Sequence, residues 1–224
     1  MRDLVVWGAA GHARVVDELV GATGTHRIVL LVDRRTIDSP LSGVPVVTPD
    51  GFVDWLATHG RDRSVDGVVA IGGGHGVDRR LIRDHLLTTL GVVPTLVHPS
   101  SWVAGTAVVE QGAQILARSC LGANARLGSA TILNTAAVVD HDCVLAAGVH
   151  IGPGAVVAGE VRLERDVFVG TGARILPKLH IGAGAVIGAG AVVTSDVPAG
   201  TTVVGCPARP VKSNDNTGSK KDFA

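Results

Sequence analysis

The chain has 224 residues, enough for one large domain or two modest ones that bury a core without disulfides or metal ions. Its 20 Lys and Arg residues are balanced by 20 Asp and Glu residues, so it lacks the global positive charge that attracts nucleic acid or an anionic membrane. With 30 glycines and only 3% aromatic residues among many small aliphatic ones, the composition predicts numerous tight turns between short strands.

Neither the cysteines nor the apolar segments indicate export or membrane insertion. Three cysteines (Cys120, Cys143 and Cys206) at no metal-ligand spacing fit a reducing compartment and exclude a disulfide-rich secreted module. The apolar stretch 4–10 runs directly into polar residues without a cleavage-type ending. The uncharged stretch 143–159 contains a histidine, a proline and several glycines, so it lacks the ~20 apolar residues of a spanning helix. We therefore expect a cytoplasmic protein that binds neither membrane nor nucleic acid.

The first half of the chain alternates between strand and helix patterns. Residues 4–7 predict a buried strand, and Val15, Val16, Leu19 and Val20 lie on one face of the helix expected next. The later patterns predict strands over 28–32, 44–47, 65–71 and 92–97, with helices over 50–58 and 77–90. Such alternation is typical of a parallel sheet with helical crossovers, a Rossmann-like α/β domain.

Two glycine-bearing turns in this domain are candidates for holding a phosphate. Gly8, Ala10, Gly11 and His12 lie where the first strand ends and a helix begins, and free N–H groups at a helix start favour anions. The run from Gly72 to Gly76 is placed in the same way after the fourth strand. Asp33, which ends the second strand, is placed where such folds contact a ribose. The alternative is that these are ordinary turns and an ordinary strand-end acid.

The second half of the chain repeats every six residues. Each sixth position from Val103 to Val193 is Val, Ile or Leu, and a small residue often follows four places later. A period of six fits neither a helix nor a plain strand, but it fits a short strand plus a corner in a solenoid. Three such units make an 18-residue coil with the aliphatic residue inside. We expect an α/β domain over 1–98, a prism of hexapeptide repeats over 99–211 and a disordered tail over 212–224.

One hexapeptide segment gathers a histidine and several acids. Asp140, His141 and Asp142 lie at a corner where side chains should point outward. Gly159 is eighteen residues after His141, one whole coil, so a base should lie beside a backbone N–H that no side chain covers. A proton acceptor and an oxyanion donor are what acyl transfer requires. The alternative is an ordinary solvated histidine.

A zinc site is an alternative function for these histidines, since some solenoids of this type are carbonic anhydrases. His141 and His180 are 39 residues apart, two 18-residue coils plus three residues, so strand spacing separates them by ~10 Å along the axis. Zinc ligands must reach the ion at ~2.1 Å. We therefore expect no metal site.

The segment Ile132 to Cys143, the opening Gly8 to Val16 and the closing Gly205 to Ala208 resemble the sialic acid O-acetyltransferase family. This family includes N-acetyltransferases acting on UDP-linked 4-amino sugars. The resemblance covers roughly residues 3–212. It implies a left-handed β-helix and a homotrimer whose active sites lie between neighbouring prisms. It also implies acetyl-CoA as cosubstrate and a nucleotide sugar held by the N-terminal domain.

The resemblance also implies roles for single residues. His141 matches the general base and Asp142 the acid that orients it, where relatives commonly have Glu; whether Asp140 serves instead stays open. His150, Gly159, Thr171 and Ala189 match positions that contact acetyl-CoA, with Gly159 N–H as the oxyanion donor. On the sugar side the matching positions are Gly8, Ala10, Gly11, His12 and Asp33, with Gly72 in a loop that departs from the family's pattern.

We therefore expect an acetyl-CoA-dependent acyltransferase that acetylates the amine of a nucleotide-linked amino sugar by direct transfer. The alternatives are O-acetylation of a sialic-acid-like sugar and a non-catalytic nucleotide-sugar-binding scaffold. Apolar residues at outward strand positions favour a trimer, because a lone prism should not expose so many; they are Ile132, Val138, Val144, Val156, Val186 and Val192.

Overall fold

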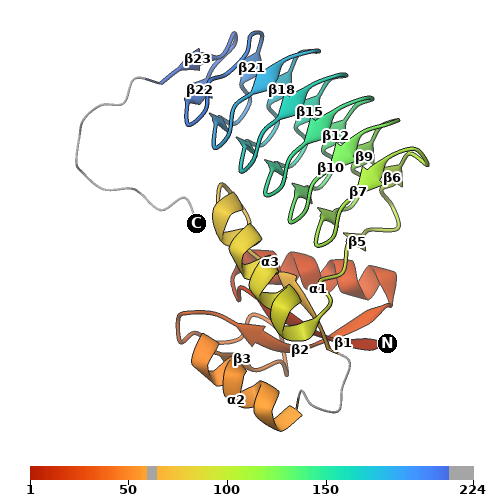
Figure 1. The fold of residues 1–224 in the computed structure, drawn as a ribbon, viewed down its shortest axis with the longest axis vertical. Coiled ribbons are helices and arrows are strands. Elements are labelled where there is room, and N and C mark those ends of the chain that lie inside the picture. The colour runs from red at the N-terminus through yellow and green to blue at the C-terminus, as the bar shows by residue number, and fades with distance from the viewer. Residues whose placement is uncertain (60–64, 212–224) are drawn as a thin grey trace.

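The computed structural model describes residues 1–59 and 65–211, which form an N-terminal α/β unit and a prism of stacked coils (Figure 1). The predicted fold class, a parallel α/β domain followed by a parallel β-helix of hexapeptide repeats, is confirmed. The predicted disorder of 212–224 lies outside the described residues. Within those residues, no helix is both long and apolar enough to cross a membrane.

The N-terminal unit is a four-stranded parallel sheet in the order β3-β2-β1-β4. Its strands are β1 (Arg2–Trp7), β2 (His26–Val32), β3 (Val46–Val47) and β4 (Val65–Val69), and its helices are α1 (Gly11–Thr23), α2 (Pro49–His59) and α3 (Gly76–Leu90). Helix α1 packs on one face of the sheet and α2 and α3 on the other. The central strand β1 is therefore apolar on both faces, and Leu4, Val5 and Val6 are fully buried.

The strand expected over 92–97 does not extend this sheet. Only β5 (Leu96–Val97) is a strand, and it pairs in parallel with β8 (Gln114–Ile115) of the prism. The chain beside β4 makes a hydrogen bond from Gly67 N–H to Val92 O (3.0 Å), and Pro94 has no N–H to continue the pairing. The sequence-based assignment of β5 to the α/β sheet was wrong, whereas the division at residue 98 stays a prediction.

The prism has three faces, which we number in chain order, and each is a sheet whose strands are parallel apart from the last strand of face 1. Face 1 contains β5, β8, β11 (Ile132–Leu133), β14 (His150–Ile151), β17 (Phe168–Val169), β20 (Val186–Ile187), β22 (Thr202–Val204) and the antiparallel β23 (Arg209–Pro210). Face 2 contains β6 (Trp102–Val103), β9 (Cys120–Leu121), β12 (Val138–Val139), β15 (Val156–Val157), β18 (Arg174–Ile175) and β21 (Val192–Val193). Face 3 contains β7 (Val108–Val109), β10 (Arg126–Leu127), β13 (Val144–Leu145), β16 (Arg162–Leu163) and β19 (His180–Ile181).

The six-residue period places every repeated aliphatic residue inside the prism. From Ile115 to Val193 none of them is more than 2% exposed, whereas Val103 and Val109 in the first coil are only partly buried because no coil stacks on their other side. At many corners the chain turns through a residue with positive φ, such as Asn124 (58°) and Asp142 (56°). We name the corners by the faces they join: edge 1/2, edge 2/3 and edge 3/1.

The N-terminal unit is fixed to face 1 and edge 3/1. The Arg79 guanidinium, 1% exposed, donates to the carbonyl oxygens of Gly73 (3.0 Å), Ala130 (3.2 Å) and Gly148 (2.6 Å). Burial lowers the pKa of Arg79 to about 10, so it stays charged at neutral pH. A buried cation that is surrounded by carbonyl dipoles from both units holds them in one arrangement.

The N-terminal unit covers part of face 1. Ile132, expected at an exposed outward position, is fully buried and belongs to the same apolar cluster as Leu4 and Val16. That expectation was wrong because the N-terminal unit packs on this part of face 1. Val138, Val156 and Val192, which lie on face 2, are instead half-buried.

Candidate active site

His141 and Gly159 lie at equivalent positions of edge 2/3 in consecutive coils. The His141 side chain is 51% exposed. Its imidazole lies over Gly159, so that a Cβ added to Gly159 would lie 2.6 Å from His141 Cε1. The Gly159 N–H has no hydrogen-bond partner in the described part of the chain. A base and a free N–H donor are therefore adjacent, as the 18-residue spacing predicts, although the imidazole itself fills the space above the glycine.

The acid that contacts the imidazole is Asp142. His141 Nδ1 donates to Asp142 Oδ2 over 2.8 Å, which leaves Nε2 with the lone pair that a base requires. Asp140 Oδ1 instead accepts from the backbone N–H of His141 (2.7 Å). The pKa of His141 is raised mainly by the hydrogen bond to Asp142, which together with smaller contributions from the charges of Asp140, Asp142 and Glu160 outweighs the opposing effect of desolvation.

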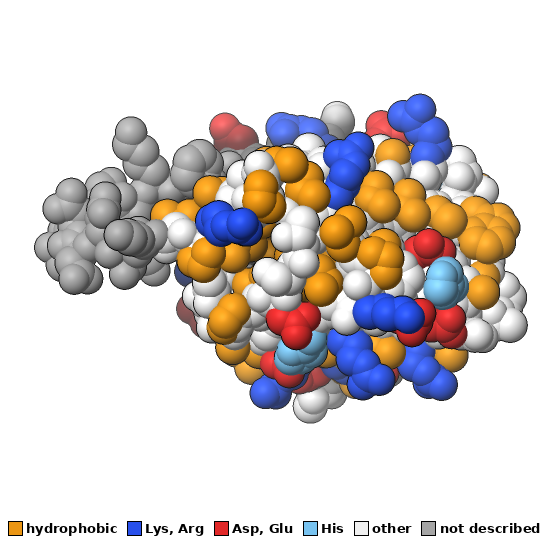
Figure 2. Space-filling view, turned by 90° about the horizontal axis from the view of Figure 1, so that it is seen from above, with side chains coloured by type: hydrophobic (Ala, Val, Ile, Leu, Met, Phe, Trp, Pro, Cys, Tyr) orange, Lys and Arg blue, Asp and Glu red, His pale blue; other side chains and the backbone are white. Residues whose placement is uncertain are grey.

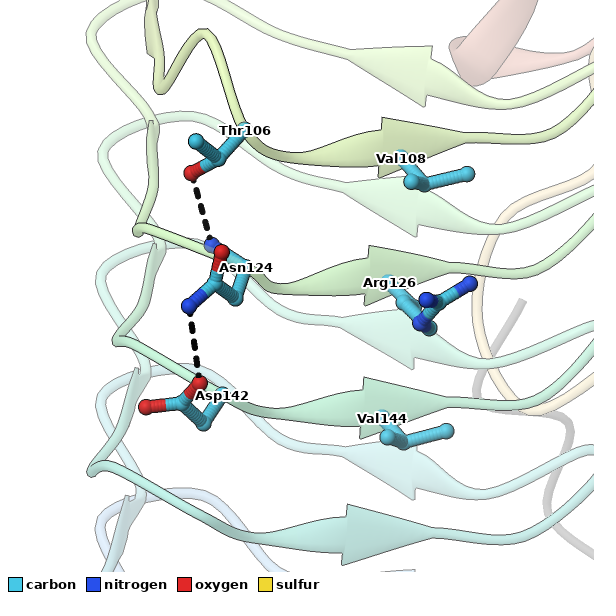
Figure 3. Close-up of a pocket in the computed structure, with 6 residues that line it drawn as sticks. All are labelled: Thr106, Val108, Asn124, Arg126, Asp142 and Val144. Atoms are coloured by element: carbon cyan, nitrogen blue, oxygen red, sulfur yellow. Dashed lines mark hydrogen bonds between the residues drawn. The ribbon is translucent and has the colours of Figure 1, made fainter.

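A shallow pocket of about 380 Å³ lies beside Asp142, on the side of face 3 (Figure 3). Its lining consists of Thr106, Val108, Asn124, Arg126, Asp142 and Val144. Asn124 Nδ2 donates to Asp142 Oδ1 over 3.1 Å. Sequence reasoning missed Asn124 and Arg126, although the 18-residue spacing that paired His141 with Gly159 also aligns Asn124 with Asp142.

Thr171 and Ala189, the expected pantetheine contacts, lie on a different edge of the prism from His141. Both are exposed and occupy equivalent positions of edge 1/2, one coil apart. Glycines lie beneath their backbone nitrogens: a Cβ on Gly152 would be 2.9 Å from Thr171 N, and one on Gly170 would be 2.6 Å from Ala189 N. Edge 1/2 thus exposes an open line of backbone on which an extended chain could lie.

His150 is buried between the prism and the N-terminal unit. It is 4% exposed, its Nδ1 donates to Gly73 O (3.1 Å) and its Nε2 accepts from Asn134 Nδ2 (3.0 Å). Burial, with the nearby Arg79 charge, lowers the pKa of His150 to about 3, so the ring is neutral at physiological pH. Both ring nitrogens are engaged within one chain, and the expected contact between His150 and acetyl-CoA stays a prediction.

The two glycine-bearing turns of the N-terminal unit lie side by side, at the edge where β1 and β4 end. A Cβ on Gly8 (φ 112°) would lie 2.5 Å from Ala70 O, and one on Gly72 would lie 3.9 Å from the His12 ring. Gly8 therefore has no room for a side chain. Ala10 is the N-cap of α1 and makes no side-chain cap, and no acidic residue lies in the first turn. The positive end of this helix dipole is open to an anion.

Asp33 and His12 fix these turns in place through hydrogen bonds. Asp33 Oδ2 accepts from Ala9 N–H (3.1 Å), and Oδ1 accepts from the backbone and side chain of Arg35 (both 3.0 Å). Burial would raise the pKa of Asp33, but the Arg35 and Ala9 hydrogen bonds outweigh it and lower that pKa. His12 Nε2 donates to Gln114 Oε1 (2.9 Å), and Gln114 Nε2 donates to Val69 O (2.7 Å). Within one chain Asp33 thus has a structural role, and its expected ribose contact stays a prediction.

One chain does not bring the two groups of residues together. The N-terminal turns lie against face 1 and edge 3/1, whereas His141 lies on edge 2/3, the corner opposite face 1. No group of three or more His, Cys, Asp or Glu side chains in residues 1–59 and 65–211 could hold a metal ion. His180 contacts Glu164 (3.0 Å) and not His141.

The sequence and the fold are similar to those of known acetyltransferases. Residues 3–79 match the family model of the PglD N-terminal domain, and residues 160–195 match that of the bacterial transferase hexapeptide (six repeats). The chain is 39% identical to the acetyltransferase domain of PglB from Neisseria gonorrhoeae, solved with acetyl coenzyme A; the alignment covers 94% of this chain and 99% of that one, with a TM-score of 0.84.

Two further relatives are enzymes or structures associated with GDP-perosamine. PerB from Caulobacter crescentus, solved with CoA and GDP-perosamine, is 33% identical over 94% of this chain and 98% of its own, with a TM-score of 0.84. GDP-perosamine N-acetyltransferase from Escherichia coli O157:H7 is 42% identical over 128 residues, which are 54% of this chain and only 58% of that enzyme. The expected resemblance is confirmed, and the chain belongs to the hexapeptide-repeat acetyltransferase family in which a PglD-type N-terminal domain precedes a left-handed β-helix.

Proposed function

We propose that this protein transfers an acetyl group from acetyl-CoA to the amine of a nucleotide-linked amino sugar. The observation that carries the proposal is the His141 imidazole, oriented by Asp142 and lying over Gly159 with its free N–H. The relatives solved with acetyl coenzyme A, or with CoA and GDP-perosamine, support the donor and the class of acceptor.

The proposed mechanism is direct transfer. The lone pair of the acceptor amine attacks the thioester carbonyl carbon, while Nε2 of His141 takes a proton from that amine. The Gly159 N–H donates to the oxygen that becomes negatively charged, and the C–S bond then breaks to release CoA. A positioned base contributes roughly 10²- to 10⁴-fold to such a rate, and one oxyanion donor roughly 10²- to 10³-fold.

The donor and the acceptor are assigned to different surfaces. We place the pantetheine chain along edge 1/2, where Thr171 and Ala189 expose the backbone. The open N-terminus of α1, with the turns at Gly8 and Gly72, is placed against the acceptor's phosphates. His141 of the same chain lies on the corner opposite face 1. The donor and acceptor surfaces therefore form a complete site only with the His141 of a second protomer.

The proposal therefore includes a homotrimer with shared active sites. Figure 2, which views the molecule from the side of face 2, shows hydrophobic side chains gathered in a stripe along the prism. The outward residues of face 2 are Trp102, Cys120, Val138, Val156, Arg174 and Val192. Packing this face around a threefold axis would bury the stripe and place edge 2/3 of one prism beside edge 1/2 of the next. We also place the reaction in the cytoplasm, in line with three free cysteines.

The test is CoA release from acetyl-CoA with a panel of GDP-, UDP- and dTDP-linked amino sugars, with the product analysed by mass spectrometry. We expect one acetyl group on an amine, which resists mild alkali. An alkali-labile product would establish O-acetylation, the alternative that the family resemblance leaves open. Binding of nucleotide sugar without any CoA release across the panel would support the scaffold function and reject the proposal.

A further inference from the structure

A column of polar side chains runs along edge 2/3 toward the catalytic pair. Thr106, Asn124 and Asp142 occupy the same corner position in three consecutive coils (Figure 3). The backbone N–H of Asn124 donates to Thr106 Oγ1 (3.0 Å), and Nδ2 of Asn124 donates to Asp142 Oδ1 (3.1 Å). The three residues are therefore linked by hydrogen bonds across two coil-to-coil steps.

The two carboxylate oxygens of Asp142 are divided between two donors. Oδ1 accepts from Asn124 Nδ2, and Oδ2 accepts from His141 Nδ1 (2.8 Å). A rotation of the carboxylate away from this orientation would break at least one of the two hydrogen bonds. This matters because Asp142 is 49% exposed and its contacts with water would otherwise allow several rotamers.

The backbone at Asn124 also fits this role. Asn124 has φ 58° and Asp142 has φ 56°, the left-handed conformation that Asn and Asp adopt more readily than most residues. With both corners in this conformation, and with the coils stacked by hydrogen bonds from Asp142 N–H to Ala123 O (2.8 Å), the two side chains lie in register.

We propose that Asn124 is a positioning residue for the acetyl transfer, acting through Asp142 to hold the imidazole of His141 over Gly159. The proposal rests on the proposed function and adds to it a residue that touches neither substrate. The Asn124 amide leaves Oδ2 free for His141 Nδ1–H, and Nε2 therefore remains the unprotonated atom that accepts the amine proton.

Several charges act on His141 besides Asp142, and the test must separate them. Asp140 and Glu160 raise the pKa of His141 through their charge, and Lys178 pairs with Glu160 (3.6 Å). Arg126 lines the same pocket as Asp142 and Asn124. Asn124 is neutral, so removing its side chain leaves every one of these charges in place.

The variants are Asn124→Ala, Asp142→Ala and the double variant. Alanine is compatible with this corner because Ala130 (φ 54°) and Ala136 (φ 55°) occupy equivalent corners in this chain. The matched control is Thr88→Ala on α3, which also removes one hydrogen bond of a neutral, exposed side chain (Thr88 Oγ1 to Asp84 O, 2.9 Å) but lies on neither edge 1/2 nor edge 2/3. The control is expected to keep wild-type turnover.

Steady-state kinetics then form a double-mutant cycle. Asn124→Ala should lower kcat by about three- to tenfold, the size expected for loss of one hydrogen bond, with both KM values changed less than about twofold. Asp142→Ala should lower kcat further, and the double variant should equal Asp142→Ala alone. Equal fold-losses for Asn124→Ala in the presence and absence of Asp142, or an unchanged kcat in Asn124→Ala, would overturn the proposal.

The pKa of His141, followed by NMR of the labelled imidazole without substrates, gives a second readout. It should fall in Asn124→Ala, fall further in Asp142→Ala and not change again in the double variant, because the effect passes through Asp142. A pKa of His141 that is unaffected by Asn124→Ala overturns the positioning role. If the wild-type protein transfers no acetyl group to any acceptor, the proposed function fails, while this titration still decides the role of Asn124.

Discussion

The imidazole of His141 occupies the space that a side chain on Gly159 would need. A Cβ on Gly159 would lie 2.6 Å from Cε1 of the ring and 3.0 Å from Cδ2. The glycine is therefore required by the histidine of the preceding coil, and the two residues form one unit in which a base lies against a free backbone N–H.

We predict that Gly159→Ala displaces the imidazole and lowers kcat by at least about tenfold, with the β-helix retained. The matched control is Gly105→Ala, at the equivalent corner of edge 2/3, where an added Cβ would have no atom within 4 Å. Kinetics and circular dichroism of both variants provide the measurement. Equal activity in the two variants would contradict the close packing of His141 on Gly159.

The pH dependence of kcat/KM should follow the deprotonation of His141. Because the hydrogen bond to Asp142 raises the pKa of His141 above 6.5, the acid limb of the profile should lie above pH 6.5. Asp142→Asn removes the negative charge, lowers the pKa of His141 and should shift that limb to lower pH with the same acceptor. A limb that stays in place would show that another group titrates. Both groups are well exposed, so we expect no matching change in folding stability.

The turn at Gly8 should tolerate no side chain. Gly8→Ala combines a φ of 112° with a contact of 2.5 Å to Ala70 O, so it should destabilise the N-terminal unit by at least about 1 kcal/mol. Gly11→Ala, with nothing within 4 Å, is the control and should keep the wild-type melting temperature. Calorimetric titration should show weaker acceptor binding in Gly8→Ala with acetyl-CoA binding retained; equal loss of both ligands would contradict separate binding surfaces.

The assembly should be a trimer whose sites are shared. Light scattering should give about 68 kDa, three copies of the 22.8 kDa chain, and Val156→Glu on face 2 should reduce this mass. Co-expression of His141→Ala with Asp33→Ala protomers should restore part of the activity, because mixed trimers contain sites with both residues intact. No restoration in mixed trimers would place the acceptor turns and His141 of one site in the same protomer.

The sequence predicted those parts of the molecule that follow from a strict period. The hexapeptide repeat placed each aliphatic residue from Ile115 to Val193 inside, and the 18-residue coil paired His141 with Gly159. The same spacing could have revealed Asn124 beside Asp142. Contacts between the two units follow no period, so the burial of His150 and Ile132 against the N-terminal unit required the three-dimensional structure.

The sequence also misjudged the junction, where β5 pairs with β8, because an isolated apolar pair carries no sign of which sheet it joins. In addition, one chain separates the turns at Gly8 and Gly72 from His141, and no pattern along the sequence reports this separation.

The most direct test of the whole account is the kcat of His141→Ala with acetyl-CoA and the best nucleotide-linked amino sugar. The imidazole acts on the acceptor proton in the transition state, so its loss should lower kcat by at least about 100-fold. The Kd for acetyl-CoA should change less than about threefold, and the melting temperature should barely change because the side chain is half exposed. Near-normal turnover in His141→Ala would contradict the account, since no base would then be required at edge 2/3.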